Sequence, residues 1–199
     1  MRIALIGASG TIGLAVLGEL GSRHEIVKAG RQGEDVKVDI GDRASIEAMY
    51  GKLGRLDAVV CCAGKVSFAP LAEMTDEKFK VGLDNKLMGQ VNLVLAGLAS
   101  LNDGGSFTLT SGILDRDPIP KGTSASAVNA ALAGFVMAAA IELPRGIRIN
   151  VVSPALLDES AAAYPGFFPG HETVPSKRVG LAYAKSVEGL ITGQVIKVG

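Results

Sequence analysis

The chain has 199 residues, 48% of them hydrophobic, and its 20 basic side chains balance its 20 acidic ones. A chain of this length buries about 70% of its unfolded surface, so its core needs neither a metal nor a disulfide. The balanced charge gives no sign of nucleic acid or an anionic membrane as a partner, and no unbroken apolar run reaches the roughly 20 residues of a membrane span. We expect one domain, residues 1–199.

Short apolar runs alternate with longer helical patterns along the chain. The runs are rich in β-branched residues and bounded by Gly, Pro or Asp, which predicts strands at RIALIG, HEIVKAG, DVKVDI, LDAVVCCAG, GSFTLTSG, RINVVSP and GQVIKVG. Helical patterns cover residues 11–21, 43–53, 76–100, 123–142 and 176–190. This alternation predicts an α/β fold with a seven-stranded parallel sheet, right-handed crossovers and helices on both faces, in three layers.

The first predicted strand is followed at once by GASGTIG, which opens the first helix. Its three glycines allow a tight turn and a close approach of the backbone to a ligand, and the helix start favours an anion. This context predicts the phosphate cradle of a doubly wound Rossmann fold. The alternative is that the glycines serve only helix–strand packing. The expected cofactor-binding residues of this turn are Gly7, Ser9, Gly10, Thr11, Ile12 and Gly13.

The end of the second predicted strand indicates which dinucleotide binds. It reads VKAGR and has no acid to accept hydrogen bonds from the ribose of NAD. Arg31 can instead pair with a 2′-phosphate, which favours NADP(H) over NAD(H), unless it is only a solvated surface arginine. After the third strand, Asp39 and Ile40 are expected to contact the adenine. The alternative for Asp39 is that it caps the helix beginning near Asp42.

Cysteine and histidine usage gives little sign of further chemistry. Cys61 and Cys62 are neighbours on a predicted strand, so they point to opposite faces, and a disulfide between them would be strained. They are expected to be buried free thiols in a reducing compartment, which favours the cytoplasm. His24 and His171 are too few and too scattered for a metal site, so none is expected.

Residues 155–175, ALLDESAAAYPGFFPGHETVP, break the alternation of strands and helices. Long irregular insertions in compact domains are usually functional, and we predict a substrate lid. Phe167 and Phe168 favour a lid over the alternative of a disordered loop, and they suggest a ligand that is partly apolar.

Five landmarks in chain order resemble the short-chain dehydrogenase/reductase superfamily. They are the glycine motif, CCAG at 61–64 in place of the family's Asn-Asn-Ala-Gly turn, SFTLTSG ending near the catalytic serine, GIRINVVSPA, and ITGQVIKVG. The resemblance implies an NADP(H)-dependent oxidoreductase that interconverts a carbonyl and an alcohol. It also implies that Ser111 is catalytic. The cofactor contacts it implies beyond the glycine motif are Cys62, Ala63, Gly64 and Pro154.

The sequence departs from the family where the chemistry should lie. The family carries a tyrosine that exchanges a proton with the substrate and, four residues later, a lysine that tunes it; the alignment puts Ala125 and Asn129 there. Counting back from Gly89 places Lys86 at the family's helical asparagine. We therefore expect Ser111 and Lys86 to carry catalysis, with Asn129 at the nicotinamide ribose. The alternatives are that Lys86 is a surface lysine on a helix and that Ser111 is a turn serine at the end of a strand.

Two functions stay open at this point: a reductase with a rebuilt proton donor, or a dinucleotide-binding sensor or scaffold without catalysis. Tyr164 and His171 are further proton donors that the lid could bring. The expected substrate is a small, partly apolar molecule. Residues 123–142 are crowded with Ala and Gly, and the resemblance implies a homodimer or homotetramer through this helix and the preceding long one.

Overall fold

The computed structural model describes residues 1–32 and 35–199. Its centre is a parallel sheet of seven strands in the order β3-β2-β1-β4-β5-β6-β7. The predicted fold class is confirmed. The strands are β1 (Arg2–Ile6), β2 (Glu25–Gly30), β3 (Val36–Lys37), β4 (Leu56–Cys61), β5 (Leu101–Thr110), β6 (Arg148–Pro154) and β7 (Val195–Val198).

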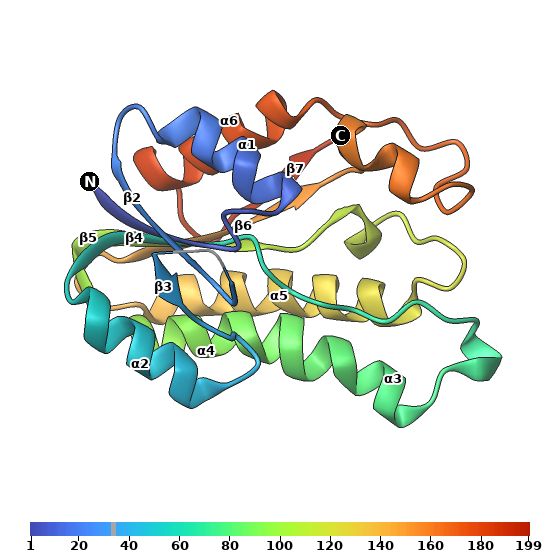
Figure 1. Cartoon of the computed structure of the whole chain (residues 1–199), viewed down its shortest axis with the longest axis horizontal. Helices are drawn as coiled ribbons and strands as arrows, with labels where there is room; N and C mark the ends of the chain where they lie inside the picture. Colours follow the sequence, from blue (N-terminus) through green and yellow to red (C-terminus); the bar gives the residue numbers. More distant parts are fainter. Residues whose placement is uncertain (33–34) are drawn as a thin grey trace.

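Helices cover both faces of the sheet (Figure 1). One face carries α1 (Thr11–Leu20) and α6 (Ser176–Glu188), and the other carries α2 (Arg43–Leu53), α4 (Met88–Gly97) and α5 (Thr123–Glu142). Short helical pieces complete the chain: η1 (Leu71–Glu73), α3 (Asp76–Lys80), the π-helical η2 (Val81–Leu87), η3 (Ile113–Asp115) and η4 (Asp158–Ala163).

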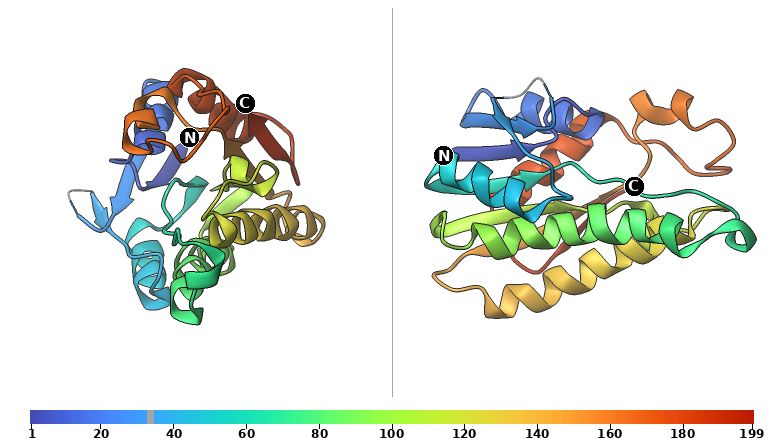
Figure 2. Two further views of the ribbon diagram at one scale, coloured as in Figure 1. Left: turned by 90° about the vertical axis from the view of Figure 1, so that its right-hand side faces the viewer. Right: turned by 60° about the horizontal axis from the view of Figure 1, so that its bottom comes forward.

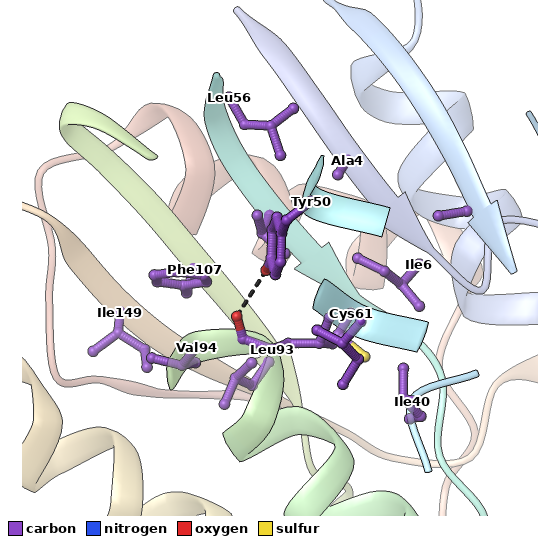
Figure 3. Close-up of a cluster of buried hydrophobic side chains, with 14 of the residues drawn as sticks. Ala4, Ile6, Ile40, Tyr50, Leu56, Cys61, Leu93, Val94, Phe107 and Ile149 are labelled. Atoms are coloured by element: carbon purple, nitrogen blue, oxygen red, sulfur yellow. Dashed lines mark hydrogen bonds between the residues drawn. The ribbon is translucent and has the colours of Figure 1, made fainter. Parts of the chain in front are cut away.

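Each face of the sheet has its own apolar core. The neighbouring cysteines divide between the two: Cys61 belongs to the core beneath α2, α4 and α5, while Cys62 packs against the core beneath α1 and α6. Both are free thiols, as expected from their alternation along the strand. In the larger core the Tyr50 hydroxyl donates to the Leu93 carbonyl at 2.7 Å (Figure 3). That bond satisfies a buried polar atom and ties α2 to α4.

Two predicted elements differ from those observed. The single helix expected over 76–100 is a succession of α3, η2 and α4. The third strand is only two residues long, because the chain turns away from the sheet after Lys37. Asp39 drives this turn: its N–H donates to the Ser45 hydroxyl at 3.0 Å and its carboxylate accepts from the Gly41 N–H at 2.9 Å.

Residues 155–175 fold back on the domain as a closed loop. Two backbone hydrogen bonds join the ends of this loop: the Asp158 N–H donates to the Val174 carbonyl at 3.0 Å, and the Val174 N–H donates to the Leu156 carbonyl at 2.9 Å. The loop contains η4 and lies at the end of the molecule toward which the strands run, as the right-hand side of Figure 1 shows. It is therefore placed at the edge of the sheet where doubly wound folds bind their ligands.

Helix α5 is long and apolar enough to cross a membrane by length and composition alone, with a mean hydropathy of 1.7 in its most apolar window. Among the described residues it is the one helix with this property. The sequence contains no unbroken apolar run of this length, because Ser124, Ser126 and Asn129 interrupt the apolar residues of α5. Its inner face packs on the sheet and buries Ser124 and Asn129, as core helices of globular proteins do.

Candidate active site

Two adjoining cavities lie beyond the carboxyl ends of the strands. The first has a volume of about 550 Å³ and the second about 510 Å³, and Gly10, Cys62 and Gly64 line both. Of the residues expected to bind the cofactor, the first cavity is lined by Gly7, Ser9, Gly10, Arg31, Asp39, Ile40, Cys62, Ala63 and Gly64. The second is lined by Gly10, Thr11, Ile12, Cys62, Gly64, Asn129 and Pro154, together with Lys86 and Ser111.

The turn between β1 and α1 is built for a close ligand. Gly7 has a φ of +81°, and a Cβ there would lie 3.2 Å from the Ala63 backbone nitrogen. Only glycine suits both conditions. Gly10 precedes α1 without a side-chain cap, and the first turn of the helix carries no acid. The N–H groups of that turn are therefore available to an anion from the cavity.

Gly13 packs α1 directly against the turn that precedes it. A Cβ there would lie 2.1 Å from the Gly7 carbonyl oxygen, so a larger residue would separate the two segments. Gly13 is not among the residues that line either cavity. Its expected role in cofactor binding stays a prediction.

The far end of the first cavity is polar. Arg31 and Gln32 line it where β2 ends, and Asp39 lines it as well. The capping alternative for Asp39 fails, because Asp42 itself caps α2 by accepting from the Ala44 N–H at 2.9 Å. Gln32 was missed by sequence reasoning. So were two more residues of this cavity, Lys65 and Asn85.

Lys86 points into the second cavity from the π-helical segment η2. Its ammonium nitrogen donates to the Ser111 carbonyl at 2.8 Å and to Asn129 Oδ1 at 2.7 Å. Gly64 makes room for the side chain, since a Cβ there would lie 2.5 Å from Lys86 Cγ. An ammonium has three donors, so these two bonds leave one for a ligand. Lys86 thus contacts Asn129, the position at which the resemblance places the family's lysine.

The environment of Lys86 tunes its protonation. Burial lowers the pKa of its ammonium from 10.5 to about 8, and Cys61 and Asp115 oppose this fall. Burial also raises the pKa of the Cys61 thiol to about 12, so this group is uncharged near neutral pH. The charge that counteracts burial in that range is therefore the Asp115 carboxylate.

The other expected catalytic positions lie around the same cavity. Ser111 is buried at its wall, and its hydroxyl lies 3.3 Å from Asp115 Oδ2 and 3.5 Å from the Val152 carbonyl. Asn129 accepts from Lys86 and donates to the Gly112 carbonyl at 3.3 Å. Ala125 lines the cavity with a methyl group, so nothing at this position can exchange a proton.

A partly buried ion pair near Ser111, Asp115 with Arg116, was also missed. The Asp115 side chain is only 7% exposed; Oδ1 accepts from Arg116 at 3.0 Å and Oδ2 from the Ser153 hydroxyl at 2.7 Å. The only sign of this pair in the sequence is an acidic residue four positions after Ser111, in a segment that lies outside the five landmarks of the family.

The loop of residues 155–175 supplies part of the apolar wall of the second cavity. Tyr164 and Phe168 line it, together with Phe68 from the opposite loop. The Phe167 ring packs edge-on against that of Phe68, with centroids 5.9 Å apart. His171 does not line the cavity and lies 3.1 Å from Asp117. Of the two candidate proton donors in this loop, Tyr164 and His171, only Tyr164 lines the second cavity.

The described residues contain no group of three or more His, Cys, Asp or Glu side chains placed to hold a metal. His24 forms an ion-pair contact with Glu188 at 2.8 Å on the surface. The site's features fit a dinucleotide instead: an uncapped helix start beside Gly7, and two adjoining cavities joined at Gly10. The phosphates of a dinucleotide could bind at the helix start, and its two nucleotide halves could each occupy one of the cavities.

Comparisons with known proteins agree with this geometry. Residues 11–182 match the family described as enoyl-(acyl carrier protein) reductase. The crystal structure of the protein lin1944 from Listeria innocua superposes with a TM-score of 0.99 at 50% identity, covering 100% of both chains. A small-chain dehydrogenase in complex with NADPH superposes with a TM-score of 0.87 at 27% identity, covering 100% of this chain and 96% of the other.

Curated relatives are more distant. An uncharacterized oxidoreductase of Methylorubrum extorquens is 33% identical over 121 residues, which cover 60% of this chain and 49% of the relative. An uncharacterized NAD-dependent oxidoreductase of Mycobacterium tuberculosis is 27% identical over 207 residues, covering 94% of this chain and 75% of the relative. The match thus spans only about half the length of the first of these relatives. The family match over 11–182, the strand order and the glycine turn together show that the chain belongs to the short-chain dehydrogenase/reductase superfamily, whose members bind nicotinamide dinucleotides.

Proposed function

We propose that the protein interconverts a carbonyl and an alcohol on a small, partly apolar molecule with NADP(H), and that Lys86 replaces the family's tyrosine as the group that moves the proton. The observation that carries the proposal is the position of the Lys86 ammonium. It lies in the second cavity, is held by Asn129 and the Ser111 carbonyl, and keeps one donor for a substrate oxygen.

The first cavity would hold the adenosine and phosphate part of the cofactor. The backbone of Gly7 and Gly10 and the start of α1 suit the phosphates, and Arg31 suits a 2′-phosphate. The relatives leave the choice of dinucleotide open, because one structural neighbour binds NADPH and a curated relative is named NAD-dependent. The preference for NADP(H) rests on Arg31 at the end of β2.

The second cavity would hold the nicotinamide and the substrate. Asn129, Ile12 and Pro154 are placed for the nicotinamide end, and the bound cofactor would supply or accept the hydride. Lys86 as an ammonium can donate its proton to the substrate oxygen, and as an amine it can take one back. A pKa near 8 allows both forms near neutral pH.

The apolar wall favours a substrate with a hydrophobic body. Phe68, Tyr164 and Phe168 line the cavity, and the contact between Phe167 and Phe68 would help to exclude water. We propose that residues 1–199 act as one dinucleotide-binding unit with 155–175 as the substrate lid.

The experiment is a turnover assay with NADPH and a panel of aliphatic and aromatic aldehydes and ketones. Lys86→Met should lower kcat by about 10²–10⁴-fold, the contribution of a positioned acid, while NADPH affinity changes by less than about threefold. Lys52→Met, on the exposed surface of α2, is the matched control and should behave as wild type.

The alternative is a dinucleotide-binding sensor or scaffold, and the observation that favours it is the methyl group of Ala125 in place of the tyrosine. It predicts tight NADPH binding without turnover of any compound in the panel, and no effect of Lys86→Met. That result would overturn the proposed activity.

We also propose that the protein self-associates through α4 and α5. These helices run side by side on one outer face (Figures 1 and 2). Their outward residues are apolar and exposed, with Met137 at 54% and Ile141 at 87% exposure, and Leu95 at 50%. Exposed apolar faces of this kind are typical of interfaces. Sedimentation should show a dimer or tetramer that Met137→Lys dissociates. The cytoplasmic location stays a prediction.

A further inference from the structure

The second cavity has an acidic group behind its wall that the proposed chemistry does not yet use. Asp115 lies at the end of η3, a short helix that returns the chain toward Ser111 because the Asp115 N–H donates to the Gly112 carbonyl at 3.0 Å. The carboxylate therefore reaches back to the serine four residues before it. Glycine at position 112 leaves the neighbouring Asn129 amide in place, since a Cβ there would lie 3.2 Å from Asn129 Nδ2.

The Asp115 carboxylate is fully engaged although it is buried. Oδ2 accepts from the Ser153 hydroxyl at 2.7 Å and from the Ser111 hydroxyl at 3.3 Å, and Oδ1 accepts from Arg116 at 3.0 Å. Arg116 in turn donates to the Ser153 hydroxyl at 2.6 Å. Hydrogen bonds and one cation thus hold a negative charge directly behind Ser111, where an isolated carboxylate would be costly.

The contacts of Ser111 decide which way its hydroxyl can act. Its two protein neighbours, Asp115 Oδ2 and the Val152 carbonyl, are both acceptors. A carboxylate attracts a hydroxyl proton more strongly than a carbonyl does. The Ser111 proton is therefore directed to Asp115, which leaves the oxygen lone pairs of Ser111 for a donor such as a substrate hydroxyl.

The same carboxylate lies close to Lys86, because Ser111 joins the two: its carbonyl accepts from the Lys86 ammonium at 2.8 Å, and its hydroxyl donates to Asp115 Oδ2 at 3.3 Å. The titratable groups that act on its ammonium are the Cys61 thiol of β4 and the Asp115 carboxylate of η3. The neutral Asn129 of α5 and the Ser111 carbonyl, just after β5, accept its hydrogen bonds. Asp84, on the same π-helical segment, is exposed to solvent. Because Cys61 is uncharged near neutral pH, Asp115 is the anion that offsets the cost of burying this ammonium.

We propose that Asp115 is a positioning residue of the active site: it orients the Ser111 hydroxyl and supplies the negative charge that keeps Lys86 protonated in the cavity. This inference rests on the proposed function for its effect on turnover, but its effect on Lys86 can be measured without any substrate.

The test compares Asp115→Asn with Asp103→Asn, which removes the same charge at the opposite, exposed end of β5. Lys86 is titrated by NMR in protein with isotope-labelled lysine Cε, and its signal is assigned with Lys86→Arg. Asp115→Asn should lower the Lys86 midpoint by about 0.5–1 pH unit, while Asp103→Asn leaves it unchanged. Equal midpoints in wild type and Asp115→Asn would overturn the proposal, whether or not turnover is ever found.

A second variant covers the orienting role and the case in which Asp115→Asn does not fold. Ser153→Ala removes the 2.7 Å bond to the carboxylate but keeps its charge. We expect kcat to fall by about tenfold through misplacement of Ser111, with NADPH affinity and the Lys86 midpoint unchanged. An active enzyme in which Ser153→Ala leaves kcat as in wild type would show that Asp115 does not orient the serine.

Discussion

The two cavities of this protein are built by different means. The first depends on backbone: Gly7 at positive φ, the uncapped start of α1, and the turn after β4 that carries Ala63. The second depends on side chains from distant segments, with Lys86 of η2 meeting Asn129 of α5 across 43 positions of sequence. The first carries the glycine turn by which the sequence resembles its superfamily, and the second is where we propose that the catalytic side chains have been rearranged.

The comparison shows which part of such a site can change. A backbone cradle needs glycines in one short stretch, and almost any side chain there would fill it. A proton donor only has to place an atom near the substrate oxygen, so it can come from any wall of the cavity. Lys86 and Asn129 are in contact, so a lysine at either position would place its ammonium in the same part of the cavity.

The largest expected effect comes from reversing this rearrangement. Lys86→Asn should lower kcat by about 10²–10⁴-fold, and adding Ala125→Tyr with Asn129→Lys should restore most of that loss. Ala125 lines the cavity, so a tyrosine there has space to enter it. Steady-state kinetics on the single and triple variants measure this. A triple variant that binds NADPH but stays as inactive as Lys86→Asn would show that the two arrangements are not equivalent.

Two glycine variants separate binding from packing in the first cavity. Gly10→Val should weaken NADPH binding by about 100-fold or more, since Gly10 lines both cavities, while stability is kept because a Cβ there meets only the Gly7 carbonyl at 3.5 Å. Gly13→Val should instead lower the free energy of unfolding by about 3 kcal/mol or more. Calorimetric titration and thermal unfolding distinguish them; equal stability of the two variants would contradict this division.

Cofactor choice tests the outer end of the first cavity. Arg31→Ala should weaken NADPH binding by about 1.5–3 kcal/mol, the value of charged hydrogen bonds, and leave NADH binding unchanged. Fluorescence titration with both cofactors measures the difference. Arg43→Ala, on the surface of α2, is the control. An equal loss for both cofactors would assign Arg31 a structural role.

The lid should show the smallest effect. Phe168→Ala removes part of the apolar wall of the second cavity and should raise KM for aromatic ketones by about tenfold, with less effect on small aliphatic ones. Leu190→Ala, at an exposed side chain outside the lid, is the control. Equal changes for both substrate classes would mean that the loop does not select the apolar body.

The fold and most of the first cavity could be predicted from the sequence because their signals are local. Strand and helix periods, the glycine turn and the end of β2 are each read within a few residues. The role of Gly13 cannot be assigned from the pattern alone, because a glycine needed for packing looks the same in the sequence as one needed for a ligand. Lys86 was found only by counting from Gly89, and its contact with Asn129 depends on how η2 and α5 pack.

Asp115 could not be predicted for a related reason. Its importance comes from the turn of η3 and from Ser153 on β6, which lies 38 positions away. No local pattern links these residues. The π-helical form of η2 was equally unforeseen, because residues 76–100 had been expected to form one regular helix.

The pH dependence of kcat for carbonyl reduction tests the central role of Lys86 most directly. Reduction needs the ammonium, so kcat should fall as pH rises through about 8, where Lys86 loses its proton, and alcohol oxidation should show the opposite slope. In Lys86→Arg the side chain stays charged, so the fall near pH 8 should disappear. A decline near pH 8 that persists in Lys86→Arg would contradict the account and assign the proton to another group of the cavity.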